Sequence, residues 1–101
     1  MSTDTDIIID EKINKVTKEP SRYRVIMLND DATPMDWVIN VLMSIYKHSE
    51  ATAKELTLKI HAEGSAIVGI YVYEIAEVKI VETTSASRER GFPLQLRMEE
   101  E

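Results

Sequence analysis

The chain has 101 residues, of which 44% are hydrophobic and 30% are charged, so its length and composition indicate one globular domain. It contains no cysteine, which excludes disulfides, thiolate zinc sites and cysteine nucleophiles. The net charge of -6 argues against nucleic acid as a partner, because no basic surface is available to displace counterions. The N-terminus lacks an apolar signal core, and no stretch approaches the roughly 20 apolar residues of a membrane span. We therefore expect a cytoplasmic monomer without a membrane partner.

The first segment, residues 1–21, is predicted to be a flexible arm ahead of a domain over residues 22–101. Ser, Thr and Asp dominate its first six positions, and Pro20 and Ser21 mark its end. Three consecutive isoleucines at positions 7–9 are apolar enough to dock somewhere. The polar composition of the rest nevertheless favours disorder.

The segment YRVIML, residues 23–28, is predicted to be a central or covered strand, because it is apolar on both faces and rich in strand-forming residues. The loop NDDA follows it. Thr33 is expected to cap a helix and Pro34 to take its first position, where a missing N–H costs nothing. That helix is expected to end over residues 47–49, and its core stripe at helical spacing consists of Val38, Val41, Leu42, Ile45 and Tyr46.

A second helix is expected over residues 50–63, with Ser49 as its N-cap and Gly64 ending it. Residues 66–73 are predicted to be a strand. Residues 74–90 are predicted to be a helix whose inward residues are Ile75, Val78, Val81 and either Thr84 or Ser85. The last strand is expected over residues 93–98, where Leu94, Leu96 and Met98 share one face. The order β-α-α-β-α-β predicts an α+β fold in which a three-stranded antiparallel sheet packs against three helices.

Two carboxylates, an amide and an imidazole carry the notable chemistry, on Asn29, Asp30, Asp31 and His61. Local pattern alone favours a plain helix-entry loop and a histidine on the surface near a helix end. If the fold brings the end of the first strand next to the end of the second helix, these side chains form a cluster rich in hydrogen-bond acceptors. Such a cluster suits an ammonium group, and it also suits a divalent metal ion. An enzyme is the weaker hypothesis, because no Ser or Lys has a recognisable nucleophile context and no glycine-rich phosphate loop is present.

The stretch YRVIMLNDDATPMDWVINVLMSIY closely resembles the ClpS family of adaptors, which deliver N-degron substrates to the Clp AAA+ protease. Its signature is a short strand followed by Asn-Asp-Asp, one variable residue and Thr-Pro-Met. Three further stretches match in order: LTLKIHAEG, AIVGIYVYEIAEVK and FPLQL. The set is specific, although no single piece would be, and it runs from about Tyr23 to the C-terminus. The resemblance implies the same β-α-α-β-α-β order.

The resemblance also implies an activity and the residues that perform it. A non-enzymatic adaptor without cofactor or metal would bind the free α-amino group and the large hydrophobic first residue of a cargo protein, typically Leu, Phe, Tyr or Trp. Carried over position by position, the residues around the α-amino group would be Asn29, Asp30, Asp31 and His61. The pocket for the first side chain would be lined by Thr33, Met35, Val38, Thr57, Ile60 and Leu94. Docking on the N-terminal domain of a ClpA- or ClpC-type unfoldase would involve Glu74, Glu77 and Lys79, and the arm would assist delivery.

Two positions depart from the family pattern. Ala32 stands where a larger residue is frequent, so no contact is assigned to its side chain. Thr57 stands where family members often carry Met, a residue interpreted as a gate against β-branched first residues. Because Thr is shorter, we expect either a wider pocket that admits Trp, Ile or Val more readily, or weaker packing around Leu.

Two other classes of function stay open on the sequence. One is a metal-dependent hydrolase that uses Asp30, Asp31 and His61. The other is a protein-interaction domain of the ribosomal-stalk C-terminal type, which shares such α+β sandwiches. The adaptor should bind a Leu-start peptide in excess chelator and should prefer a free N-terminus to an acetylated one. We expect a bacterial cytoplasmic protein ahead of a plastid one.

Overall fold

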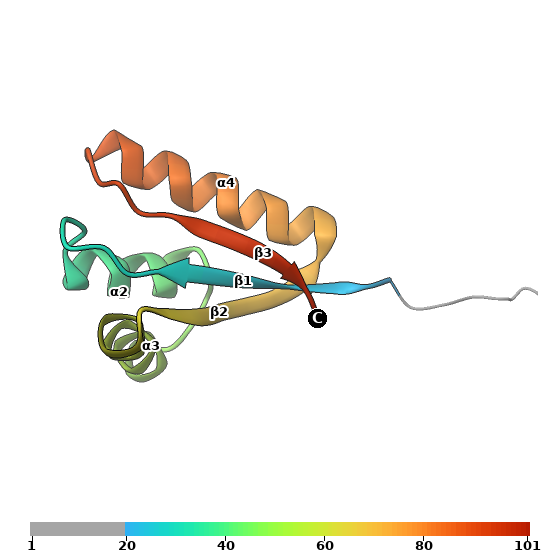
Figure 1. Ribbon diagram of the computed structural model, residues 1–101, viewed down its shortest axis with the longest axis horizontal. Helices are drawn as coiled ribbons and strands as arrows, with labels where there is room; N and C mark the ends of the chain where they lie inside the picture. The colour runs from blue at the N-terminus through green and yellow to red at the C-terminus, as the bar shows by residue number, and fades with distance from the viewer. Residues whose placement is uncertain (1–19) are drawn as a thin grey trace, which may run out of the picture.

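The computed structural model of the protein describes residues 20–101, so the expected arm lies outside them except for its last two residues. The elements of this part follow in the order β1 (Arg22–Leu28), α2 (Met35–Ser44), α3 (Glu50–Glu63), β2 (Ser65–Val72), α4 (Tyr73–Glu89) and β3 (Leu96–Glu100) (Figure 1). This order confirms the predicted α+β fold. None of the helices described has the length and apolar character that crossing a membrane requires.

The strands form one antiparallel sheet in the order β2-β1-β3, with β1 in the centre (Figure 1). Val25 and Met27 of β1 are fully buried and lie opposite Met98 and Leu96 of β3. Ile26 points to the other face of the sheet, since successive strand residues alternate, and it is still only 6% exposed. The central place of β1 therefore explains why its sequence is apolar on both faces.

One hydrophobic cluster joins the sheet to α2, α3 and α4. Met27 of β1 and Leu42 of α2 are its largest fully buried side chains, and burying each stabilises the fold by about 1.5–3 kcal/mol. The other fully or nearly buried apolar members are Val25, Val38, Val41, Tyr46, Ala53, Ile60, Ala66, Val68, Ala76 and Leu94.

Helix α2 ends earlier than expected, at Ser44 instead of over residues 47–49. Lys47 adopts a left-handed conformation with φ +62°. The N–H of His48 then donates to the carbonyl of Leu42 at 3.0 Å, a bond that closes the helix terminus and turns the chain towards α3. The next helix, α3, has the predicted bounds. Ser49 accepts a hydrogen bond from the N–H of Thr52, and Gly64 ends the helix with φ +93°.

The inward face of α4 is not the one that its apolar residues predict. Ile75, Val78 and Val81 are 46%, 51% and 57% exposed, so the expectation that they pack inward is wrong. The buried residues of the helix are small: Ala76, Thr83 and Ser87. Short side chains let the helix axis lie close to the sheet, and the hydroxyls find partners. The Thr83 hydroxyl, for example, lies 2.7 Å from the Tyr46 hydroxyl and donates to the carbonyl of Lys79, one helical turn earlier.

Candidate functional site

Two backbone hydrogen bonds fix the end of β1 next to two other parts of the fold. The N–H of Asn29 donates to the carbonyl of Gly64 at 2.9 Å, and the N–H of Leu28 donates to that of Gln95 at 3.0 Å. The first bond joins the residue after β1 to the glycine that ends α3, and the second joins β1 to the segment before β3. The proximity that the sequence left conditional is therefore present in the structure.

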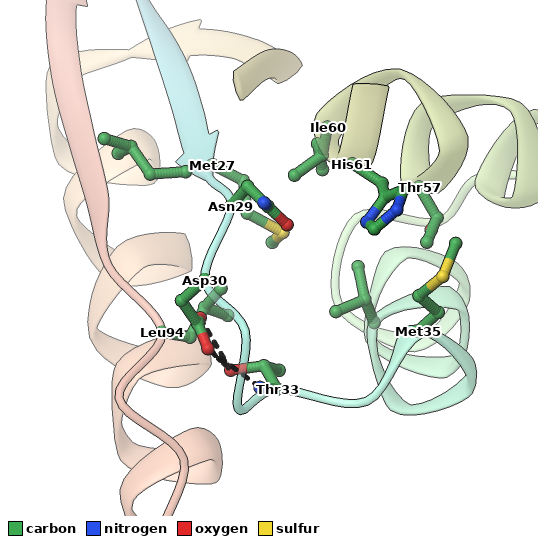
Figure 2. Close-up of a pocket in the computed structure, with 11 residues that line it drawn as sticks. Met27, Asn29, Asp30, Thr33, Met35, Thr57, Ile60, His61 and Leu94 are labelled. Atoms are coloured by element: carbon green, nitrogen blue, oxygen red, sulfur yellow. Dashed lines mark hydrogen bonds between the residues drawn. The ribbon is translucent and has the colours of Figure 1, made fainter. Parts of the chain in front are cut away.

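A narrow cavity of about 20 Å³ lies at this junction, and side chains from β1, α2, α3 and the segment before β3 converge on it (Figure 2). All six residues that the resemblance assigns to the hydrophobic pocket line it: Thr33, Met35, Val38, Thr57, Ile60 and Leu94. Met27 and Leu28 also line the cavity, and sequence reasoning missed them. The available signal was their place at the end of a strand that leads into the Asn-Asp-Asp loop.

The inner wall of the cavity is buried and mostly apolar, and its mouth is exposed. Val38, Thr57, Ile60 and Leu94 are each between 2% and 6% exposed, whereas Met35 is 39% exposed. A cavity of about 20 Å³ has room for a water molecule but not for an aromatic ring. An apolar ligand side chain must therefore displace part of the wall, and the flexible thioether of Met35 is the most exposed part of it.

A wider cleft of about 270 Å³ adjoins this cavity. All four predicted polar residues border the cleft: Asn29, Asp30, Asp31 and His61. Asn29, Asp30 and His61 also line the narrow cavity, but Asp31 does not. The side chains of Asn29 and His61 come from opposite sides of the opening, the end of β1 and helix α3 (Figure 2). A ligand with one cationic and one apolar end would find both environments side by side.

The carboxylate of Asp30 holds the loop that carries the site. Its Oδ1 accepts hydrogen bonds from the N–H groups of Ala32 and Thr33, each at 2.8 Å. The Thr33 hydroxyl donates to the same carboxylate, at 2.7 Å from Oδ2 (Figure 2). Thr33 is therefore not the N-cap of α2, as the sequence suggested. Pro34 occupies that position, and no side chain caps the helix.

The geometry gives no support to a metal-dependent hydrolase. Within residues 20–101, no group of three His, Cys, Asp or Glu side chains is placed to hold a metal ion. The oxygens of Asp30 already accept several hydrogen bonds from the loop. Asp31 and His61 are both exposed at the rim, where a cationic group can reach them directly.

The three residues assigned to unfoldase docking lie on α4 but do not share an environment. Glu74 and Glu77 are exposed. Lys79 is half-buried, and its ammonium donates to the carbonyl of Ile45 at 2.7 Å. It also lies 5.7 Å from the centre of the Tyr71 ring. Lys79 thus links α4 to the carboxyl end of α2, whereas the two glutamates face outward.

Residues 18–97 match the family model described as ATP-dependent Clp protease adaptor protein ClpS. The chain belongs to the ClpS family. A ClpS protein of Treponema denticola is 51% identical over 81 residues, which are 80% of each chain. Another, from Maricaulis maris, is 43% identical over 90 residues, covering 89% of this chain and 83% of the relative. Both relatives are described as ATP-dependent Clp protease adapter proteins.

A solved structure gives the same family and the same fold. It is ClpS2 of Agrobacterium tumefaciens bound to L-phenylalaninamide, which matches with a TM-score of 0.79 and 40% sequence identity. The match covers 82% of this chain and all of ClpS2. Membership in the ClpS family therefore rests on sequence and architecture together.

Proposed function

We propose that this ClpS chain is a non-enzymatic adaptor that binds proteins through their first residue and delivers them to a Clp AAA+ unfoldase-protease. The observation that carries the proposal is a narrow, mostly apolar cavity that opens into a cleft bordered by two carboxylates, an amide and an imidazole. The ligand of the related ClpS2, L-phenylalaninamide, has the two features that such a site would recognise, a free α-amino group and an apolar side chain.

Binding of the α-amino group determines which class of ligand the site accepts. Its pKa of about 7.7–8.0 keeps it mostly or partly protonated near neutral pH. Hydrogen bonds from an ammonium to carboxylates are roughly twice as strong as neutral ones. We assign the direct contacts to Asn29, Asp31 and His61, and we assign Asp30 chiefly to holding the loop, because its carboxylate already accepts bonds from Ala32 and Thr33.

The first side chain supplies selection among N-termini. Burying a Leu or Phe side chain contributes about 1.5–3 kcal/mol, and the inner wall of the cavity is apolar and shielded from solvent. The family resemblance implies Leu, Phe, Tyr and Trp as first residues, and each of them extends an apolar group beyond its β-carbon. The exposed Met35 at the mouth would let the cavity widen around the larger rings.

The proposed partner is the N-terminal domain of a ClpA- or ClpC-type unfoldase, and the proposed place of action is the bacterial cytoplasm. The outward face of α4 is the proposed docking surface, with Glu74 and Glu77 beside exposed apolar residues. The expected arm would assist delivery. Both assignments extend the family resemblance to positions of this chain.

The decisive experiment compares two peptides of one sequence, both beginning with Leu, of which one is acetylated. Fluorescence anisotropy in excess chelator should show binding of the free peptide and roughly tenfold or greater weakening on acetylation, because the charge and a donor are lost. Asp31→Ala and His61→Ala should weaken the free peptide, and Glu55→Ala, at an exposed position elsewhere on α3, should not.

Three results would contradict parts of this proposal. Equal binding of both peptides would favour a general interaction domain. Binding that chelator abolishes would favour a metal site. Full affinity in Asp31→Ala and His61→Ala would remove these two residues from the assignment.

A further inference from the structure

A second cleft, of about 200 Å³, lies between α2 and the chain that follows α4. Its floor is aromatic. Trp37 and Phe92 are half-buried and meet edge to face, with ring centres 5.2 Å apart and planes at 75°, a stable arrangement of two rings. The remaining lining residues are Pro34, Asp36, Asn40 and Arg90. No residue assigned to the amino group, to the first side chain or to unfoldase docking belongs to this cleft.

The cleft adjoins the cleft that borders the amino-group site. Pro34 lines both, so a polypeptide whose first residue is held in the narrow cavity would cross Pro34 to reach the aromatic floor. An extended chain advances about 3.3–3.6 Å per residue. Residues downstream of the bound first residue are therefore the ones that can lie over Trp37 and Phe92.

The polar groups of the cleft combine donors with acceptors. The guanidinium of Arg90 lies 5.7 Å from the centre of the Phe92 ring, and within residues 20–101 it forms no ion pair. Asn40 is exposed and offers an amide with two donor hydrogens and one acceptor oxygen. Asp36 adds a carboxylate. A ligand carboxylate would be repelled by Asp36 and a ligand cation by Arg90, whereas a neutral peptide group complements both.

We propose that this cleft binds the extended main chain of the cargo downstream of its first residue, through Asn40 and Arg90. It recognises peptide groups over the aromatic floor and not particular side chains, so it adds affinity without adding sequence preference. The inference rests on the proposed function, because binding of the first residue is what places the following ones over Trp37 and Phe92.

The test uses two ligands that differ in reach, and calorimetry on the full chain measures both. L-Phenylalaninamide has one residue and ends before the cleft, whereas a peptide of Phe followed by five Gly extends into it. Asn40→Ala and Arg90→Ala should weaken the peptide roughly three- to tenfold, the effect expected for losing one hydrogen bond. Both variants should bind L-phenylalaninamide with the same affinity as the wild type. Arg97→Ala, at an exposed position on β3, is the matched control and should change neither ligand.

A second ligand series tests the assignment to the main chain. Sarcosine in place of Gly at peptide positions three to five removes the N–H donors but keeps the carbonyls, so it should remove the part of the added affinity that depends on acceptance by Asn40 and keep the part that depends on donation by Arg90. Replacing the same Gly residues by Ala, Ser or Leu should alter the affinity by less than about threefold, below the loss of one hydrogen bond. A larger dependence on side chains would overturn recognition of the main chain.

The inference and the proposed function fail in different ways. The inference is overturned if both cleft variants bind the peptide as the wild type does, or if they weaken L-phenylalaninamide as much as the peptide. If the wild type binds neither L-phenylalaninamide nor the peptide, the proposed function itself is wrong and the inference falls with it.

Discussion

Thr57 is a position at which the resemblance implies a departure from the family pattern, and its local geometry gives that expectation a physical meaning. Its hydroxyl donates to the carbonyl of Ala53 at 2.8 Å, so the polar atom is satisfied within α3 and the side chain is held in place. The residue is 3% exposed and lines the narrow cavity (Figure 2). What it presents to a ligand is therefore a fixed, short and largely apolar surface.

We predict that Thr57→Met narrows the cavity and changes the ranking of first residues. The longer side chain fills space that a bulky or β-branched ligand side chain needs, and overpacking is unfavourable. Trp-start and Ile-start peptides should lose roughly three- to tenfold in affinity relative to a Leu-start peptide, which corresponds to about 0.7–1.4 kcal/mol. Anisotropy titrations with Leu-, Phe-, Trp- and Ile-start peptides measure the ranking.

Thr57→Val is the matched control for this prediction. Valine keeps the branched shape but lacks the hydroxyl, so the bond to Ala53 is lost while the surface facing the ligand is nearly unchanged. The ranking of first residues by affinity should be the same in Thr57→Val as in the wild type. An unchanged ranking in Thr57→Met would show that this position does not set first-residue preference.

The composition of the apolar wall followed from the family resemblance, but the different roles of the two aspartates did not. The resemblance at the Thr-Pro-Met and Thr-x-x-Ile-His stretches names residues that do meet around one cavity. Asp30 and Asp31 are chemically identical neighbours, however. Only the turn of the loop decides which carboxylate accepts the N–H groups of Ala32 and Thr33 and which one is exposed.

At the scale of an element, α4 shows why periodicity can identify a helix and still assign the wrong face to the core. Three of its apolar residues, Ile75, Val78 and Val81, form an exposed stripe. Its core contacts come from small residues such as Ala76 and from the half-buried Ile80. A hydrophobic stripe predicts burial, but not whether the burial is against the same chain or against a partner. The exposed stripe, flanked by Glu74 and Glu77, fits the proposed unfoldase surface.

We predict that Val78→Asp weakens binding to an isolated unfoldase N-terminal domain and leaves the free energy of unfolding within about 0.5 kcal/mol of the wild type. Val78 is 51% exposed, so the fold does not depend on its burial, whereas an aspartate would place an unpaired charge in the docked surface. Calorimetric titration and chemical unfolding measure the two quantities. Leu58→Asp, at a position 60% exposed on α3, is the matched control and should leave docking intact. A large loss of stability in Val78→Asp would contradict this interpretation.

The arrangement of the whole molecule could be predicted only in part. The order of the elements followed from turn signals and β-propensity, and the expectation that β1 is a central or covered strand is confirmed by its place in the middle of the sheet. The contacts that position the site are different in kind. They join residues far apart in the sequence, as the bond from Asn29 to Gly64 does, and local periodicity carries no information about them.

Tyr46 is another long-range link, and it makes stability depend on alkaline pH. Its hydroxyl lies 2.7 Å from that of Thr83 on α4, and the residue is 5% exposed. Burial raises the pKa of Tyr46 from 10.0 to about 12. The folded protein therefore holds this proton more tightly than the unfolded chain does. The corresponding stability is fully present below pH 10 and is lost as the pH rises towards 12.

Two pKa units correspond to about 2–3 kcal/mol, which is the loss we expect from Tyr46 between pH 9 and 12. Urea unfolding of the wild type and Tyr46→Phe across this range isolates the contribution, because Phe cannot ionise. At neutral pH Tyr46→Phe should be less stable by only about 0.5–1.5 kcal/mol for the lost hydrogen bond, and the difference should shrink or reverse above pH 10. Tyr73→Phe, at a residue 44% exposed, should follow the wild type. A parallel decline in wild type and Tyr46→Phe would show that the alkaline sensitivity arises elsewhere.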